Sequence, residues 1–141
     1  MTDILSALWQ TLASGLPFLL LHFFTTLVLL ILGALLYTLI TPFRERALIA
    51  EGNRAAGLVL GGALLSLAIP LAATLATSSL WLDIVLWGLV AVLIQLLTLA
   101  IFILLFRGFR AAIEAENIAA ALMLVSVQLA IGLLNAGAMS G

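Results

Sequence analysis

The sequence predicts an all-α, polytopic membrane protein with four transmembrane helices, paired as two similar helical hairpins and preceded by a short interfacial helix. Of its 141 residues, 66% are apolar and 8% are charged, whereas soluble domains are roughly half apolar and a quarter charged. Four intervals free of Asp, Glu, Lys and Arg can each hold the roughly 20 residues of a membrane span: 4–43, 55–82, 84–106 and 117–141. A soluble bundle would need polar outer faces, which these intervals lack.

The basic residues predict the orientation in the membrane. All are arginines, and they form two clusters separated by two predicted spans: Arg44, Arg46 and Arg54, then Arg107 and Arg110. Loops rich in Lys and Arg stay on the cytoplasmic side of the membrane. We therefore expect an even number of crossings, with both termini on the outer side.

Residues 1–16 are expected to form an amphipathic helix at the membrane surface. Trp9 suits the headgroup level, because its indole has an apolar body and a polar edge. It shares one arc at helical spacing with Ile4, Leu5, Leu8 and Leu12, opposite Ser6, Gln10 and Ser14. The alternative is a frayed, hydrated terminus.

Three residues after this segment mark where the predicted spans begin or end. Pro17 suits the first turn of a helix, Pro42 ends the first span, and Gly108 ends or bends the third. The four spans are expected at residues 17–41, 55–77, 83–106 and 117–138, so that residues 17–78 form the first hairpin and residues 79–141 the second.

An offset of 64 residues aligns the chain with itself. Residues 53–60 (NRAAGLVL) fall on residues 117–124 (NIAAALML), and both copies follow an arginine-bearing loop. Two units that each cross twice share one orientation, so the copies are expected to be related by an axis near the membrane normal.

Asn53 and Asn117 begin the aligned segments and have two interpretations. Asn is a favoured N-cap, whose side-chain oxygen accepts from free N–H groups of the first helical turn. Alternatively, the two helix N-termini point into a shared cytoplasmic vestibule for an anion or a polar solute, which Arg54 would favour and the loop glutamates would oppose.

Three more polar residues lie within the predicted spans. Gln95 and Gln128 fall at mid-depth, where an amide needs partners; they either pair and hold helices together or line a water-filled path. His22, the only histidine, lacks the companions needed for a metal site. It is expected to be a packing or interfacial residue, with a proton-responsive role as the alternative.

The second span has the residues of a close-packing helix. Small side chains let helices approach in lipid, and they fall on two faces, which implies two neighbours: Gly57, Gly61, Ala68 and Ala72 on one, and Gly62, Ser66 and Ala73 on the other. Pro70 removes the donor for the carbonyl of Ser66, so a kink is expected there.

The chain lacks the residues that several classes of function require. The chain has no cysteine, and we find no nucleophile beside a base, no phosphate loop and no metal cluster. We therefore expect no enzyme, no cofactor and no metal. A net charge of −1 gives no general attraction to nucleic acid.

Ordered motifs along about residues 17–140 resemble the bacterial inner-membrane family of YjfL-like proteins, the domain of unknown function 350. In the first half these are Thr41-Pro42, Glu51-Gly52-Asn53, Ala55-Ala56, Gly62, Leu64-Leu65 and Ile69-Pro70-Leu71. In the second half they are Trp87-Gly88, Ala91, Ile94-Gln95-Leu96-Leu97, Asn117, Ala119-Ala120, Gly132-Leu133-Leu134-Asn135-Ala136 and Met139.

The resemblance implies a small four-span protein of the bacterial inner membrane built of two similar hairpins, but no activity. In that membrane, the outer side expected for both termini from the arginine clusters is the periplasm. It marks recurring positions: Asn53, Pro70, Trp87, Gln95, Asn117 and Asn135. Asn135 is expected to cap or pair with the outer loop. Gln128 and His22 fall outside the family pattern.

The chain is expected to contact the lipid bilayer, and the sequence leaves two alternatives for its function. One is a homo-oligomeric channel or transporter for a small polar solute or ion, motivated by Gln95, the two cytoplasmic helix starts and the kink at Pro70. The other is a non-transporting scaffold or regulatory subunit for another membrane protein, because no ionisable residue lies at mid-depth.

Overall fold

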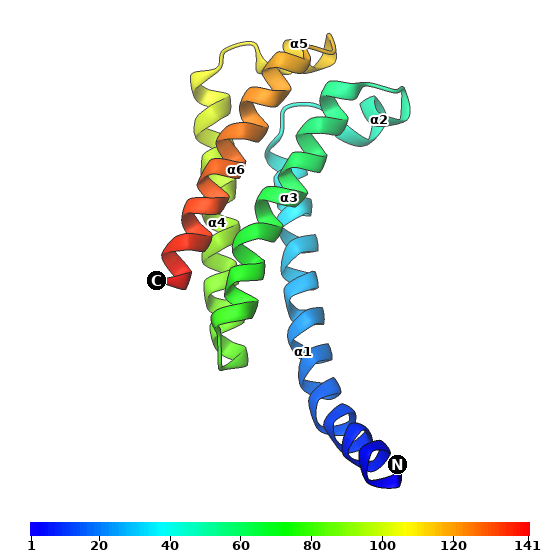
Figure 1. Ribbon diagram of the computed structural model, residues 1–141. Coiled ribbons are helices and arrows are strands. Elements are labelled where there is room, and N and C mark those ends of the chain that lie inside the picture. The colour runs from blue at the N-terminus through cyan, green and yellow to red at the C-terminus, as the bar shows by residue number, and fades with distance from the viewer.

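The computed structural model describes residues 1–141 and contains only helices (Figure 1). Four of them, α1, α3, α4 and α6, are long and apolar enough to cross a membrane, so the predicted helical class and number of spans are confirmed. The helices are α1 (Thr2–Ile40), α2 (Glu45–Ala50), α3 (Arg54–Thr77), α4 (Trp81–Leu105), α5 (Phe109–Glu114) and α6 (Ile118–Ser140).

The spanning helices form a bundle whose most extensive contact is between α3 and α6, and α1 and α4 complete it. The short helices α2 and α5 both lie at one end of the bundle, α2 beside α3 and α5 beside α6 (Figure 1). We call this the arginine end, because the connections there carry all five arginines. The opposite end, at residues 78–80 between α3 and α4, is called the turn end.

The first helix differs from the predicted arrangement. Residues 2–40 form one continuous helix of 39 residues, with Pro17 inside it rather than at its start. At roughly 1.5 Å per residue, α1 is about 58 Å long. Its residues 2–21 are exposed, and its N-terminal part extends past the turn end (Figure 1). Pro17 removes one backbone donor, whereas a full break beside lipid would leave several backbone groups unpaired.

The connections that hold α2 and α5 end in the same way. The N–H of Asn53 donates to the carbonyl of Leu48 (2.9 Å), and that of Asn117 donates to Ala112 (2.9 Å). The residues before the asparagines, Gly52 (φ 86°) and Glu116 (φ 59°), are left-handed, which completes a Schellman motif at both places. Equivalent residues are 64 apart. Neither short helix was predicted, because six residues give no usable periodicity.

The buried apolar side chains are distributed unequally along the bundle. A cluster at the arginine end draws buried residues from α1, α3, α4, α5 and α6, and Leu48 of α2 packs against it, whereas the cluster nearer the turn end contains Leu29, Leu71 and Ile84. The larger cluster comprises Tyr37, Phe43, Ala55, Ala56, Val59, Ala63, Leu99, Phe109, Ile113, Ala120, Ala121 and Leu124. The arginine end is therefore the more tightly held part of the fold.

The two small faces of α3 have different surroundings. A Cβ at Gly62 would collide with the side chain of Val125 on α6. At Gly57 and Gly61, a Cβ would meet nothing within 4 Å. One face of α3 thus packs against α6, whereas side chains added at the glycines of the other face would enter open space.

We predict that Gly62→Ala lowers stability whereas the neighbouring Gly61→Ala does not. Overpacking against the stiff, branched Val125 should cost about 1–3 kcal/mol. The alanine at residue 61 should be neutral or stabilising by up to about 1 kcal/mol, because alanine favours helix. Reversible unfolding in detergent micelles measures both variants, and equal stabilities would contradict the assigned packing.

Candidate functional site

The predicted mid-depth residue Gln95 lies at the centre of a polar cluster within the bundle. Its side chain is fully buried, and Nε2 donates to two backbone carbonyls, that of Ser66 on α3 (3.1 Å) and that of Gln128 on α6 (3.1 Å). One amide from α4 therefore bridges the two helices with the most extensive contact.

Two neighbouring residues make this bridge possible. Pro70 has no N–H, so the Ser66 carbonyl lacks the donor four residues later that a regular helix supplies. Gly132 provides the room, because a Cβ there would lie 2.8 Å from the Ser66 oxygen and 3.0 Å from Gln95 Nε2. Gln95 thus satisfies the carbonyl freed by Pro70.

Tyr37 extends the cluster to the fourth spanning helix. Its buried hydroxyl on α1 donates to Gln128 Oε1 (3.0 Å). Gln95 Oε1 and Gln128 Nε2 are buried without partners, so the two glutamines meet through the Gln128 backbone and not through paired amides. The buried side chains of Tyr37, Gln95 and Gln128 thus join helices through hydrogen bonds.

Asn53 and Asn117 both cap helices. Asn53 Oδ1 accepts from Ala56 N (2.9 Å) at the start of α3, and Asn117 Oδ1 accepts from Ala120 N (3.1 Å) at the start of α6. Only Asn53 also joins the two connections, because its Nδ2 donates to the carbonyl of Ile113 on α5 (2.8 Å).

Two exposed ion pairs lie at the arginine end. Arg54 pairs with Glu116 (3.2 Å), whose carboxylate also accepts from the Arg54 backbone N–H (3.1 Å). Arg110 pairs with Glu114 within α5 (2.8 Å). The remaining arginines, Arg44, Arg46 and Arg107, have no acidic partner, so this end of the bundle presents free guanidinium groups.

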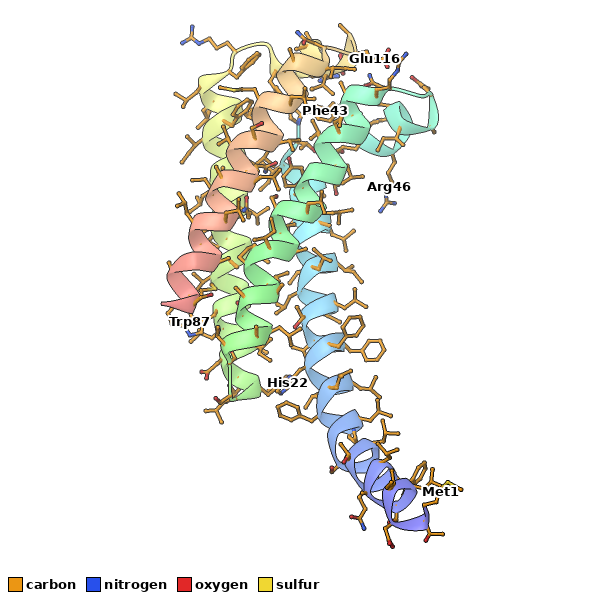
Figure 2. The ribbon with its side chains drawn as sticks, in the orientation of Figure 1. Met1, His22, Phe43, Arg46, Trp87 and Glu116 are labelled. Atoms are coloured by element: carbon orange, nitrogen blue, oxygen red, sulfur yellow. The ribbon has the colours of Figure 1, made fainter.

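His22 is buried on α1, where its ring packs against Phe18 with centroids 3.8 Å apart. Figure 2 shows His22 near the turn end of the bundle. No group of three or more His, Cys, Asp or Glu residues could hold a metal ion.

A cavity of about 500 Å³ lies at the turn end between α3, α4 and α6. It includes Asn135, whose buried Nδ2 has no hydrogen-bond partner, and Asp83, which forms no ion pair. Figure 2 places Trp87 beside the end of α6. The lining residues are Thr74, Thr77, Ser78, Asp83, Trp87, Val90, Ile94, Asn135, Ala138 and Met139.

Comparison with known proteins identifies the family. The family described as Domain of Unknown Function (DUF350) matches residues 11–139. The chain belongs to this family. The UPF0719 inner membrane protein YjfL of Escherichia coli (strain K12) is 34% identical over 119 residues, which cover 84% of this chain and 90% of that protein. The protein of the same name from Escherichia coli O157:H7 matches to the same extent. No solved structure matches significantly.

Two residues of this DUF350 chain were not predicted from the sequence: Tyr37, in the polar cluster around Gln95, and Asp83, at the turn-end cavity. Tyr37 is the only tyrosine and lies inside a span, a place where a hydroxyl needs a partner. Asp83 lies at the start of the third predicted span. Its separation of four residues from Trp87 was the available signal, because residues i and i+4 share a helix face.

We predict that Pro70→Ala partly rescues Gln95→Leu. The leucine leaves the buried Ser66 carbonyl without a donor, and alanine at residue 70 supplies the N–H that a regular helix uses. The favourable coupling should be about 0.5–2 kcal/mol, the range of hydrogen bonds between helices in membranes. Unfolding of the four proteins of this cycle in micelles measures it. Pro17→Ala, on α1, should show no coupling to Gln95→Leu; additive effects for Pro70→Ala would contradict the assigned bridge.

Proposed function

We propose that this chain is a non-transporting subunit of the inner membrane that packs against another membrane protein and has no enzymatic activity of its own. The closed core supports this proposal. Gln95 and Gln128 are fully buried and hydrogen-bonded to neighbouring helices, which supports a packing role for them over a water-filled path within one chain.

The open face of α3 is the observation that carries the proposal. Gly57 and Gly61 form a G-x-x-x-G motif, which lets another helix approach closely in lipid, and nothing in this chain fills the space beside them. Further along α3, Ala68 and Ala72 line an apolar groove of about 140 Å³ between α1 and α3. The docking surface is therefore defined as Gly57, Gly61, Ala68 and Ala72.

A homo-oligomeric channel or transporter for a small polar solute or ion is the second candidate. Its support is the half-polar cavity at the turn end, together with the same face of α3, which could receive a second copy. In this case the path would run between copies.

The orientation and the position of the N-terminal segment are part of the proposal. The free arginines support a cytoplasmic arginine end and periplasmic termini, and the relative in Escherichia coli is named an inner membrane protein. The exposed apolar residues before Pro17, including Leu8 and Trp9, would be costly in water. We propose that this part of α1 lies in the membrane interface.

We also propose that the bundle arose from two duplicated hairpins, α1–α3 and α4–α6. Support comes from the equivalent Schellman motifs and the two capping asparagines, all offset by 64 residues.

We predict that a cysteine at Leu64, beside the docking surface, crosslinks to a partner in native membranes. The chain has no cysteine of its own, so the reaction has no background, and Leu97→Cys on lipid-exposed α4 is the control. Gly61→Leu should abolish the adduct without unfolding the chain, because its side chain would fill the docking surface. An adduct containing only two copies of this chain, or solute flux in liposomes that Gln95→Leu removes, would contradict the proposal.

We predict that a periplasm-dependent reporter fused after Gly141 is active and that the same reporter inserted after Arg107 is inactive. The reason is that arginine-rich connections are retained in the cytoplasm. Alkaline phosphatase activity in intact cells measures both fusions. The reverse pattern would contradict the proposed orientation.

A further inference from the structure

An apolar groove of about 520 Å³ lies between α4 and α6, on helices other than the one that carries the docking surface. Its volume is within the range of sites for small molecules. Thr98 is the only lining residue that is not hydrophobic, and its hydroxyl donates to the Ile94 carbonyl within α4 (2.8 Å). The groove therefore fits a hydrocarbon chain better than a polar solute.

The position of the groove corresponds to one leaflet of a bilayer. Its walls are drawn from residues 98–106 of α4 and the turn that follows, and from residues 123–131 of α6. Each segment is about 12 Å long at roughly 1.5 Å per residue, and half of a hydrocarbon core is about 15 Å thick. The groove starts at the arginine end, and Thr98 lies only three residues from the mid-depth Gln95. Its length and depth thus match one acyl chain of a lipid in the leaflet at the arginine end.

Aromatic rings stiffen one wall of this groove. Phe102 and Phe106 stack with their centroids 5.7 Å apart and their planes at 12°. The buried ring of Phe109 meets both of them edge-on, at 5.4 Å and 5.8 Å. Because these contacts fix the rings within the chain, the wall is formed before an acyl chain enters, which lowers the entropic cost of binding.

A positive charge adjoins the mouth of the groove. Phe106 is the last lining residue on this side, and the exposed Arg107 follows it directly. Arg107 has no acidic partner, because Glu114 and Glu116 each pair with another arginine. A guanidinium group binds the oxygens of a phosphate in a bidentate manner. The mouth of the groove is therefore complementary to a negatively charged headgroup.

A second apolar groove offers a comparison within the same molecule. It has a volume of about 760 Å³, lies between α1 and α4, and is lined by hydrophobic residues and Thr25. This groove includes Trp81 at the turn end, whereas all five arginines are at the other end of the bundle. It can receive an acyl chain but has no cation with which to select a headgroup.

From these observations we propose that the groove between α4 and α6 binds an anionic phospholipid of the leaflet at the arginine end. One acyl chain lies along the groove, and Arg107 binds the headgroup phosphate. A zwitterionic lipid offers the same chain, but its own positive group offsets the charge of the phosphate. The site therefore selects lipids whose headgroup has a net negative charge, independently of any partner on α3.

Photocrosslinking of the full-length protein in nanodiscs of phosphatidylcholine tests the proposal. Two probes carry the same diazirine in the acyl chain, one as phosphatidylglycerol and one as phosphatidylcholine, at equal low mole fraction. Mass spectrometry of the peptides then locates the adducts. The anionic probe should label the groove between α4 and α6, at residues such as Ile101 and Met123, about fivefold more than the zwitterionic probe. This ratio corresponds to the roughly 1 kcal/mol that one basic residue contributes toward an anionic lipid.

The groove between α1 and α4 is the internal control, and the two probes should label it equally. Equal labelling of the groove between α4 and α6 by the two probes would overturn the proposal. A preference of the same size in both grooves would also overturn it, because the selection would then not come from Arg107.

Variants assign the selection to one residue. Arg107→Gln should bring the ratio of the two probes close to one, and it should not unfold the chain, because Arg107 is exposed and has no ion-pair partner. Arg46→Gln is the matched control: Arg46 is also exposed and unpaired, but Figure 2 shows it beside α2, on the side of α3 away from α6. A ratio that persists in Arg107→Gln, or that falls as much in Arg46→Gln, would contradict the assignment.

Gly61→Leu separates this proposal from that of a protein partner. It fills the docking surface on α3 and should leave the ratio of the two probes unchanged. A loss of the ratio in this variant would overturn a lipid site that is independent of α3. The comparison of the two probes on the unmodified protein holds even if a variant fails to fold.

Discussion

The bundle depends on one backbone carbonyl that the membrane cannot hydrate. Pro70 has no N–H to donate to the Ser66 carbonyl. In hydrocarbon, no water is available to form the missing hydrogen bond. Gln95 provides the replacement, at 3.1 Å, and reaches it only because Gly132 keeps α6 close to α3. The spacing of the two central helices and the register of α4 against them are thus coupled through a single amide.

The two ends of the bundle are built differently. At the arginine end, α2 and α5 close over the spanning helices, Phe109 and Ile113 are buried, and Asn53 ties one connection to the other. Toward the turn end the apolar cluster shrinks to three residues, α1 leaves the bundle, and a cavity opens between α3, α4 and α6. Local opening is easiest where few buried apolar contacts must be broken, so motion should be concentrated at the turn end.

The sequence predicted the features of the fold that hydropathy and charge determine, namely the helical class and the positions of the spans. The expected spans 55–77 and 83–106 differ by no more than two residues from α3 and α4 at either end, because long apolar intervals bounded by charged residues mark a membrane span. The sequence also predicted that the Ser66 carbonyl lacks its helical hydrogen-bond donor, since this follows from the position of Pro70. The residue that donates to this carbonyl, Gln95, could not be predicted, because the side chain that reaches the carbonyl depends on the rotation and spacing of α4 and α6. The same holds for Tyr37, whose partner lies 91 residues away, and for the cavity, which needs three helices in place. At Pro17, local propensity indicated a helix start, but the backbone cost of a break beside lipid prevailed.

The length of α1 has a consequence for how the chain is inserted. Its 39 residues contain more than one window of about 20 residues that can cross the hydrocarbon core, so hydropathy alone leaves the depth of this helix ambiguous. Leu29, Gly33 and Tyr37 are buried against the rest of the bundle, and these contacts favour one depth together with the arginines that follow the helix. The depth of the first helix is therefore expected to depend on helices that follow it in the chain, through contacts such as that of Tyr37 with Gln128.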